Sequence, residues 1–321
     1  MSGTLKNHTI TKKRRQGYQL SVSNPQAKGF VKQAEEISEE QPESFARIVL
    51  HAIRNDKIAL AGLCIISAIV IMAVFANYLA PYNPNALNLS QRLRPPSWQH
   101  LLGQDELGRD ILSRIIYGAQ VSLQVGLAVV GSSLLIGLVL GTLAGYYGGK
   151  TDIVLMRFVD IFLSFPGIIL AVGTVAIIGP GLENVIIALI IINWPSYTRV
   201  VRAEVLKTKE KEFVTASRGM GASNFWIMRS HIIPSSLSPV IVLATIGFGF
   251  AVLAEAGLSF IGLGVRPPTP SWGGMVSEGL SYIINAPNLA LFGGLAIAIT
   301  VLSFNMLGDG LRDALDPSLR I

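Results

Sequence analysis

Charged residues are scarce in this sequence. Only 14% of its 321 residues are Asp, Glu, Lys or Arg, 50% are hydrophobic, and the mean hydropathy is +0.51. Soluble domains usually carry about 25% charged residues. The composition therefore excludes an ordinary soluble domain and indicates a chain that crosses a membrane several times.

Cysteine and histidine are also rare. The single cysteine, Cys64, lies in an apolar run and can form neither an internal disulfide nor a thiolate metal cluster. The four histidines, His8, His51, His100 and His231, all lie outside the apolar runs, so an intramembrane serine protease would have no base at membrane depth. No HExxH pattern or similar spacing indicates a metal site. We therefore expect no catalytic site, metal or cofactor in this chain.

Six runs are long and apolar enough to cross a bilayer as helices. A hydrocarbon core of about 30 Å needs about 20 helical residues. The runs lack the sustained period-two alternation of membrane strands. We predict an all-α membrane protein with six transmembrane helices, at about 58–80, 120–146, 153–178, 183–201, 236–256 and 289–308.

Basic residues indicate the orientation of these spans. Lys and Arg are concentrated in residues 1–57, a turn near Lys150, the segment 202–235 and the C-terminal tail, and such segments tend to stay in the cytoplasm. We therefore expect both termini to be cytoplasmic. The net charge of +6 fits attraction to the lipid surface, so no nucleic-acid partner is predicted.

Composition divides the chain into three parts. Residues 1–44 form a polar tail of mixed charge, for which we expect partial disorder. Residues 45–57 place apolar side chains on one helical face and basic side chains elsewhere, which is typical of an interfacial helix. Residues 58–321 hold the six spans, with a cytoplasmic loop at 202–235.

Two carboxylates fall within predicted spans, although a charge deep in the bilayer costs about 2.5 to 3.5 kcal/mol to insert. Asp160 lies one turn beyond Arg157, and we expect an i,i+3 ion pair near the inner surface. Glu255 lies near the outer end of the fifth span, where it would either meet a substrate amine or be solvated at the rim. Asp160 and Glu255 are thus the candidates for a substrate pathway.

Two segments on the outer side have clear local patterns. In ELGRDILSRIIYGA, residues 106–119, apolar side chains share one helical face and Asp110 and Arg114 form an i,i+4 pair, which predicts a surface helix leading into the second span. The proline-rich RPPTPSWGG, residues 266–274, predicts a stiff extended loop with Trp272 at the membrane interface. Either segment could receive an external partner.

One stretch imitates a phosphate-binding loop. AGYYGGKT, residues 144–151, matches a loosened form of that pattern, with Ala144 in place of the first glycine. A true phosphate loop joins a short strand to a soluble helix, whereas long apolar runs flank this one. We interpret it as a tight cytoplasmic turn with Lys150 as an anchor.

A polar insert separates the fourth and fifth spans. In EFVTASRGMGASNFWIMRSHIIP, residues 212–234, Phe213, Ala216, Ser217 and Met220 share a helical stripe. Gly221 should end this helix and Ser223 should cap the next one. Two short amphipathic helices of this kind form a docking knob, and the alternative is a solvated connector.

The insert resembles the EAA motif in the cytoplasmic loop of ABC-importer permeases. In that motif E-A-A is followed by three residues, a glycine, nine residues and I-x-L-P. Alignment on Gly221 and Pro234 puts Thr215, Ala216 and Ser217 at E-A-A, and puts His231 and Ile233 at the apolar positions before the proline. The Glu and the second Ala of the motif are therefore replaced here.

Four other stretches resemble hallmark segments of the C-type permease of dipeptide, oligopeptide and nickel importers. They are HLLGQDELGRDILSRIIYGAQVSL at 100–123, VDIFLSFPGIILA at 159–171, GVRPPTPSWGGM at 264–275 and GDGLRDALDPSLR at 308–320. The resemblance covers about residues 45–321. It implies a type I ABC-importer permease with six spans.

The resemblance also implies partners and a coupling site. The permease would pair with a homologous permease subunit, two cytoplasmic ATPase subunits that bind ATP and Mg, and an external substrate-binding protein. The first helix of the insert would lie in a groove of an ATPase subunit. The implied coupling residues are Glu212, Phe213, Ala216, Ser217, Arg218, Met220 and Gly221.

The cargo and one alternative class stay open. Permeases of this kind serve dipeptides, longer peptides, nickel or other small solutes, and the lack of a His or carboxylate cluster in the spans favours peptides. A secondary transporter or channel working alone would require inverted repeats and an embedded ion site. No convincing repeat is visible in the sequence.

Overall fold

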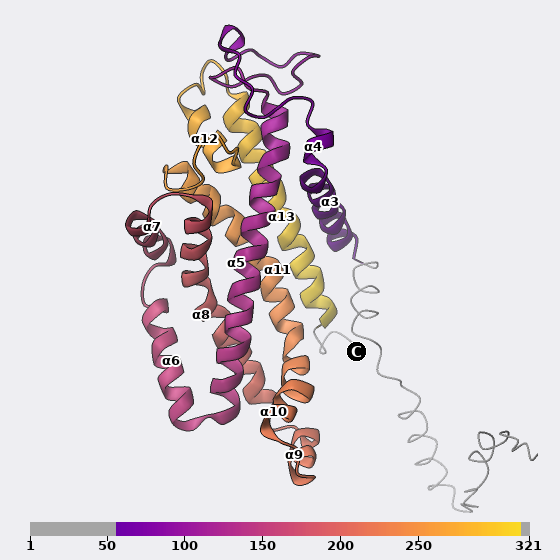
Figure 1. The fold of residues 1–321 in the computed structure, drawn as a ribbon. Helices are drawn as coiled ribbons and strands as arrows, with labels where there is room; N and C mark the ends of the chain where they lie inside the picture. Colours follow the sequence, from indigo (N-terminus) through magenta and orange to yellow (C-terminus); the bar gives the residue numbers. More distant parts are fainter. Residues whose placement is uncertain (1–55, 316–321) are drawn as a thin grey trace, which may run out of the picture. The chain divides into compact units, whose positions relative to one another are not determined.

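The computed structural model describes residues 56–315, which belong to one compact unit. The predicted polar tail, 1–44, lies outside these residues, as does the predicted interfacial helix, 45–57, except for positions 56 and 57. Figure 1 shows a helical bundle, and the described residues contain no β-strand. The all-α prediction is therefore confirmed for this part of the chain.

Within residues 56–315, five helices are long and apolar enough to cross a membrane. Four of them contain the predicted spans and extend beyond them, because polar residues at the ends continue the helical hydrogen bonding. The fifth, at the first predicted span, ends early and is followed by the short helix α4(Ala76–Leu79). The five are α3(Lys57–Val74), α5(Ile111–Tyr147), α8(Leu182–Thr208), α11(Ile233–Phe260) and α13(Asn288–Leu315).

The third predicted span is broken rather than continuous. It consists of α6(Gly149–Leu163) and α7(Gly167–Ile178), which meet at an angle of 83°. Pro166 precedes α7; it has no backbone N–H to continue a helix, and its ring disfavours helical geometry at Phe165. The span predicted over 153–178 is therefore sharply bent, and six spans result when this bent pair counts as one.

Small residues let the second and fourth spans approach closely. A Cβ added at Gly137, Gly141 or Gly145 of α5 would come within 2.5 to 2.8 Å of atoms of α8. Side chains such as Val201 and Val205 fill this narrow space. The glycines of the second span therefore allow close packing of α5 against α8.

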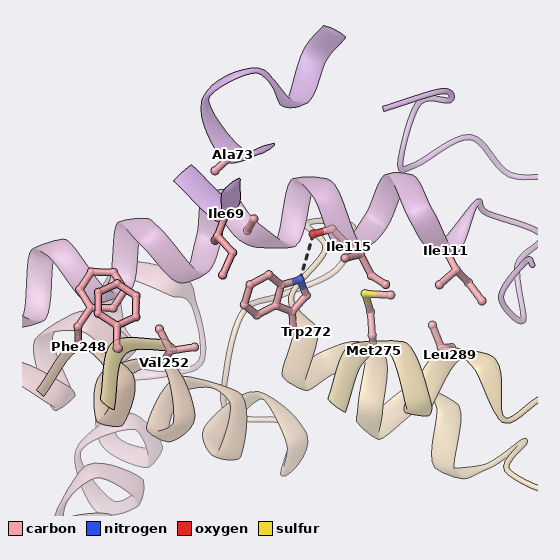
Figure 2. Close-up of a cluster of buried hydrophobic side chains, with 11 residues drawn as sticks. Ile69, Ala73, Ile111, Ile115, Phe248, Val252, Trp272, Met275 and Leu289 are labelled. Atoms are coloured by element: carbon pink, nitrogen blue, oxygen red, sulfur yellow. Dashed lines mark hydrogen bonds between the residues drawn. The ribbon is translucent and has the colours of Figure 1, made fainter. Parts of the chain in front are cut away.

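Trp272 lies in the core and not at the membrane interface (Figure 2). It begins α12(Trp272–Leu280), is 1% exposed, and its indole Nε1 donates to the carbonyl oxygen of Ile115 at 3.0 Å. Gly118 on α5 makes room for the ring. The interface prediction is wrong because the indole N–H has a backbone acceptor inside the protein, so burial leaves no unpaired donor.

The outer segment 100–110 is a folded loop held by ion pairs. Arg109 and Arg114 both bind the buried carboxylate of Asp105, and both also reach Glu278 of α12. Asp110 does not pair with Arg114, contrary to the prediction. Its Oδ2 instead caps α5 by accepting from the Ser113 backbone N–H at 2.8 Å, so the helix begins at Ile111 rather than within ELGRD.

Candidate functional site

The polar insert forms two short helices at one end of the bundle. They are α9(Glu212–Gly219) and α10(Asn224–Ile227), and Figure 1 shows them at the end opposite α12. The π-helical turn η2(Met228–Ile232) joins α10 directly to α11. A structural change at α9 therefore has a short covalent route to the fifth span.

The turn between the two helices follows the sequence prediction. Gly221 has φ +84°, a left-handed conformation that glycine adopts without strain, and its N–H donates to the Arg218 carbonyl oxygen at 3.0 Å. Ser223 caps α10, its side chain accepting from the Trp226 N–H at 3.3 Å. Both predictions are confirmed.

One face of the insert packs against the bundle. Val214 of α9 belongs to a buried cluster that joins the insert to α5, α8 and the start of α11. The other buried members are Tyr146, Val201, Val205, Ile227, Met228, Ile232 and Val240. The insert is therefore a packed part of the fold, which argues against a merely solvated connector.

Polar contacts also hold the insert in place. Tyr146 of α5 donates from its hydroxyl to Asn224 Oδ1 at 2.9 Å, and the Arg218 guanidinium lies 5.8 Å from the centre of the Tyr146 ring. Ser217 Oγ lies 3.1 Å from His231 Nε2. These contacts fix the insert to the end of α5, and they fix α9 to the turn η2 that leads into α11.

The opposite face is exposed and largely apolar. Met220 is 81% exposed, and Phe213 and Trp226 are also exposed. Ala216, Glu212 and Arg218 lie on the exposed side of α9 as well. Bulky apolar groups outside the core mark contact surfaces, so this exposed face is suited to binding another protein.

Ser217 lies on the inner face of α9. It is 5% exposed, so it does not share the exposed stripe of Phe213, Ala216 and Met220 that the sequence predicted. The pattern also gave no role to Trp226 or His231. His231 contacts Phe213 and Ser217 of α9 and also contacts Trp226, and the turn at Gly221 brings these residues together.

The two pathway candidates are differently placed. Asp160 accepts from Arg199 Nη2 of α8 at 2.7 Å, so the predicted pair with Arg157 is wrong. The partner comes from another helix because α6 packs along α8, which a local spacing rule cannot foresee. A second pair, Asp152 with Arg202, joins the same two helices.

Glu255 is fully buried in α11 rather than solvated at a rim. One carboxylate oxygen accepts from Ser259 Oγ at 2.6 Å, and the other has no hydrogen-bond partner. Ser259 Oγ in turn accepts from the Val265 N–H at 3.2 Å. Glu255 thus ties the end of α11 to the loop that follows it.

One group of carboxylates has the spacing of a metal site. Oxygens of Asp105, Glu106 and Glu278 lie within 4.8 Å of one another. Arg109 and Arg114 bind these same carboxylates and compensate their charge. The group is therefore explained as an ion-pair network that connects the outer loop to α12.

Comparison with known families identifies the fold. A family model described as the inner membrane component of binding-protein-dependent transport systems matches residues 137–321. A second, described as the N-terminal transmembrane domain of oligopeptide transport permease C, matches residues 44–96. The chain belongs to this permease family. It is an ABC-importer permease of the C type, as the motifs predicted.

Curated relatives of the permease match most of its length. The dipeptide transport system permease protein DppC of Alkalihalophilus pseudofirmus is 47% identical over 268 residues, which cover 84% of this chain and 88% of that protein. The di/tripeptide permease DppC of Pseudomonas aeruginosa is 46% identical over 272 residues, covering 83% and 90%. The glutathione permease GsiD of Pectobacterium atrosepticum is 45% identical over 261 residues, covering 81% and 86%.

A solved structure shares the permease fold. A chain of the MetNI methionine ABC transporter, in inward-facing form, aligns with a TM-score of 0.54 and 23% identity, covering 64% of this chain and 98% of that chain. This likeness confirms the predicted ABC-importer permease fold. It carries no information on cargo.

Proposed function

We propose that this chain is the C-type permease subunit of an ATP-driven importer that carries di- or oligopeptides across the cytoplasmic membrane of a prokaryote. Support for peptide cargo comes from relatives at 46% and 47% identity that are named as dipeptide and di/tripeptide permeases. The glutathione permease is consistent with this class, because glutathione is itself a small peptide. Both termini would then be cytoplasmic.

The proposed importer has four kinds of partner. This permease pairs with a homologous permease subunit in the lipid membrane, receives cargo from an external binding protein, and is driven by two cytoplasmic ATPase subunits. ATP and Mg bind to the ATPase subunits. This chain supplies no catalytic group to hydrolysis.

The observation that carries the coupling role is the exposed apolar face of α9, a helix whose inner face lies against the bundle. Phe213, Ala216 and Met220 offer contact area, and the small Ala216 allows close approach of an ATPase groove. Glu212 and Arg218 supply polar contacts at the rim. Gly221 sets the angle at which α9 leaves the bundle.

Two variants test this role. Ala216→Arg places a long charged side chain in the contact, and Gly221→Pro imposes φ near −65° where the backbone has +84° and also removes an N–H donor. Both should abolish peptide uptake in cells while the amount of permease in the membrane stays normal.

Thr151→Arg is the matched control, since Thr151 is an exposed residue of α6 outside the insert. It should keep normal uptake. Normal uptake in both test variants would contradict the proposed coupling role.

A further inference from the structure

His231 connects both short helices of the insert to the fifth span. It lies in η2, the π-helical turn that leads into α11. Its ring centre is 5.5 Å from that of Phe213 on α9 and 4.9 Å from that of Trp226 on α10, both in edge-on geometry. One side chain therefore contacts both α9 and α10 and lies in the turn that leads into α11.

In the hydrogen bond between His231 and Ser217, the donor can be inferred from the other partner of the Ser217 hydroxyl. Ser217 has one hydroxyl hydrogen, and its Oγ also lies 2.8 Å from the Phe213 carbonyl oxygen, which can only accept. When the hydroxyl donates to this carbonyl, Ser217 Oγ is free to accept, and His231 Nε2 donates to it at 3.1 Å. The arrangement satisfies the buried hydroxyl on both sides.

The bond lies where packing alone leaves α9 weakly held. Val214 is the only apolar side chain of α9 in the buried cluster, and Ser217 is the second residue on its inner face. Besides this anchor, α9 has the contact of Arg218 with the Tyr146 ring, so few contacts oppose rotation of this eight-residue helix. A second fixed point one turn further along removes this rotation.

We propose that His231 is a positioning residue for coupling: its hydrogen bond to Ser217 fixes the orientation of α9 so that motion of the ATPase subunits is passed to α11. This inference rests on the proposed coupling role of α9. The π-helical turn fits it, because such turns are rare and occur frequently at functional sites.

Three single variants separate the hydrogen bond from the ring contacts. Ser217→Ala removes the acceptor, and His231→Phe keeps an aromatic ring but removes the donor. His231→Gln loses the ring and retains an N–H near the position of Nε2. The complete importer, reconstituted in vesicles with its binding protein and a dipeptide, is assayed for the number of ATP molecules hydrolysed per peptide imported.

A net hydrogen bond of ordinary strength corresponds to a change of about fivefold in the population of the correct orientation. We expect Ser217→Ala and His231→Phe each to raise ATP consumption per peptide about fivefold, and the double variant to do no more than either single one. His231→Gln should recover most of the coupling. A merely structural role would lower the amount of assembled importer without changing this ratio.

Normal coupling in Ser217→Ala and His231→Phe, or effects that multiply in the double variant, would overturn the proposal. Ala216→Arg in the same assay distinguishes failure of the His231 positioning role from failure of the α9 coupling role. If it abolishes uptake while the Ser217 and His231 variants behave normally, only the positioning role fails. If it too has no effect, the coupling role of α9 fails.

Discussion

Glu255 shows how a single residue changes meaning once its surroundings are known. In the sequence it was a carboxylate near the end of a span, which fitted either a pathway or a solvated rim. In the structure it is fully buried and hydrogen-bonded to Ser259, which also receives the Val265 N–H. The geometry favours a tie between helix and loop over a group that meets cargo.

Substitution of Glu255 tests this interpretation. Glu255→Gln keeps an oxygen that accepts from Ser259 and removes the ability to ionise, so peptide uptake should stay within about twofold of wild type. Glu255→Ala leaves the Ser259 hydroxyl without this acceptor and should lower the amount of permease in the membrane. Loss of uptake in Glu255→Gln at normal permease level, for peptides with a free amino terminus, would instead assign Glu255 to the pathway.

Local signals predicted individual residues well when the chemistry was confined to one turn. Gly221 and Ser223 were predicted correctly because a positive φ and a helix cap depend on neighbours within four residues. Asp160 and Asp110 were assigned the wrong partners because Arg199 and His100 reach them through tertiary packing or a folded loop. Local spacing gives no access to such contacts.

At the scale of elements, ion pairs connect the outer loop and the start of α5 to α12: Arg109 and Arg114 both bind Glu278. Burial, and secondarily the adjacent charge of Asp105, raise the pKa of Glu106 above its ordinary value. The folded permease thus binds this proton more tightly than the unfolded chain. The corresponding stability is fully present below about pH 4.5, the ordinary pKa, and is lost as the pH rises through the raised value.

Glu106→Gln should flatten this part of the pH dependence. As the pH rises above 4.5, the melting temperature of the wild-type permease in detergent should fall by more than that of the variant. Glu183→Gln, a change at an exposed acid at the start of α8, is the control and should follow wild type. Parallel curves for wild type and Glu106→Gln would contradict the assigned cause.

Among the helices, hydropathy predicted where the spans lie, but it did not predict the bend within the third span. Five of the six runs became long helices because each is apolar over about 20 residues. The 83° bend at Pro166 was missed, since hydropathy is unchanged by a turn and the proline alone does not fix an angle. The packing of α5 on α8, by contrast, was signalled by the glycines of the second span.

The whole molecule has two exposed ends, for which we propose different partners. The exposed face of α9 lies at one end of the bundle, and the outer loop that precedes α5 lies at the other (Figure 1). Met220 is 81% exposed at the first end and Trp98 is 97% exposed at the second. The sequence predicted this polarity from the distribution of Lys and Arg, whereas the inward position of Ser217 needed the structure.

Site-specific photo-cross-linking in the assembled importer tests this polarity and the central claim together. A photoreactive residue at position 220 should cross-link to an ATPase subunit and not to the binding protein, and one at position 98 should never label the ATPase. Position 127, an exposed site near the middle of the membrane-spanning helix α5, is the control and should label neither partner. If position 220 fails to label the ATPase while the importer still hydrolyses ATP and takes up peptide, α9 is not the coupling element.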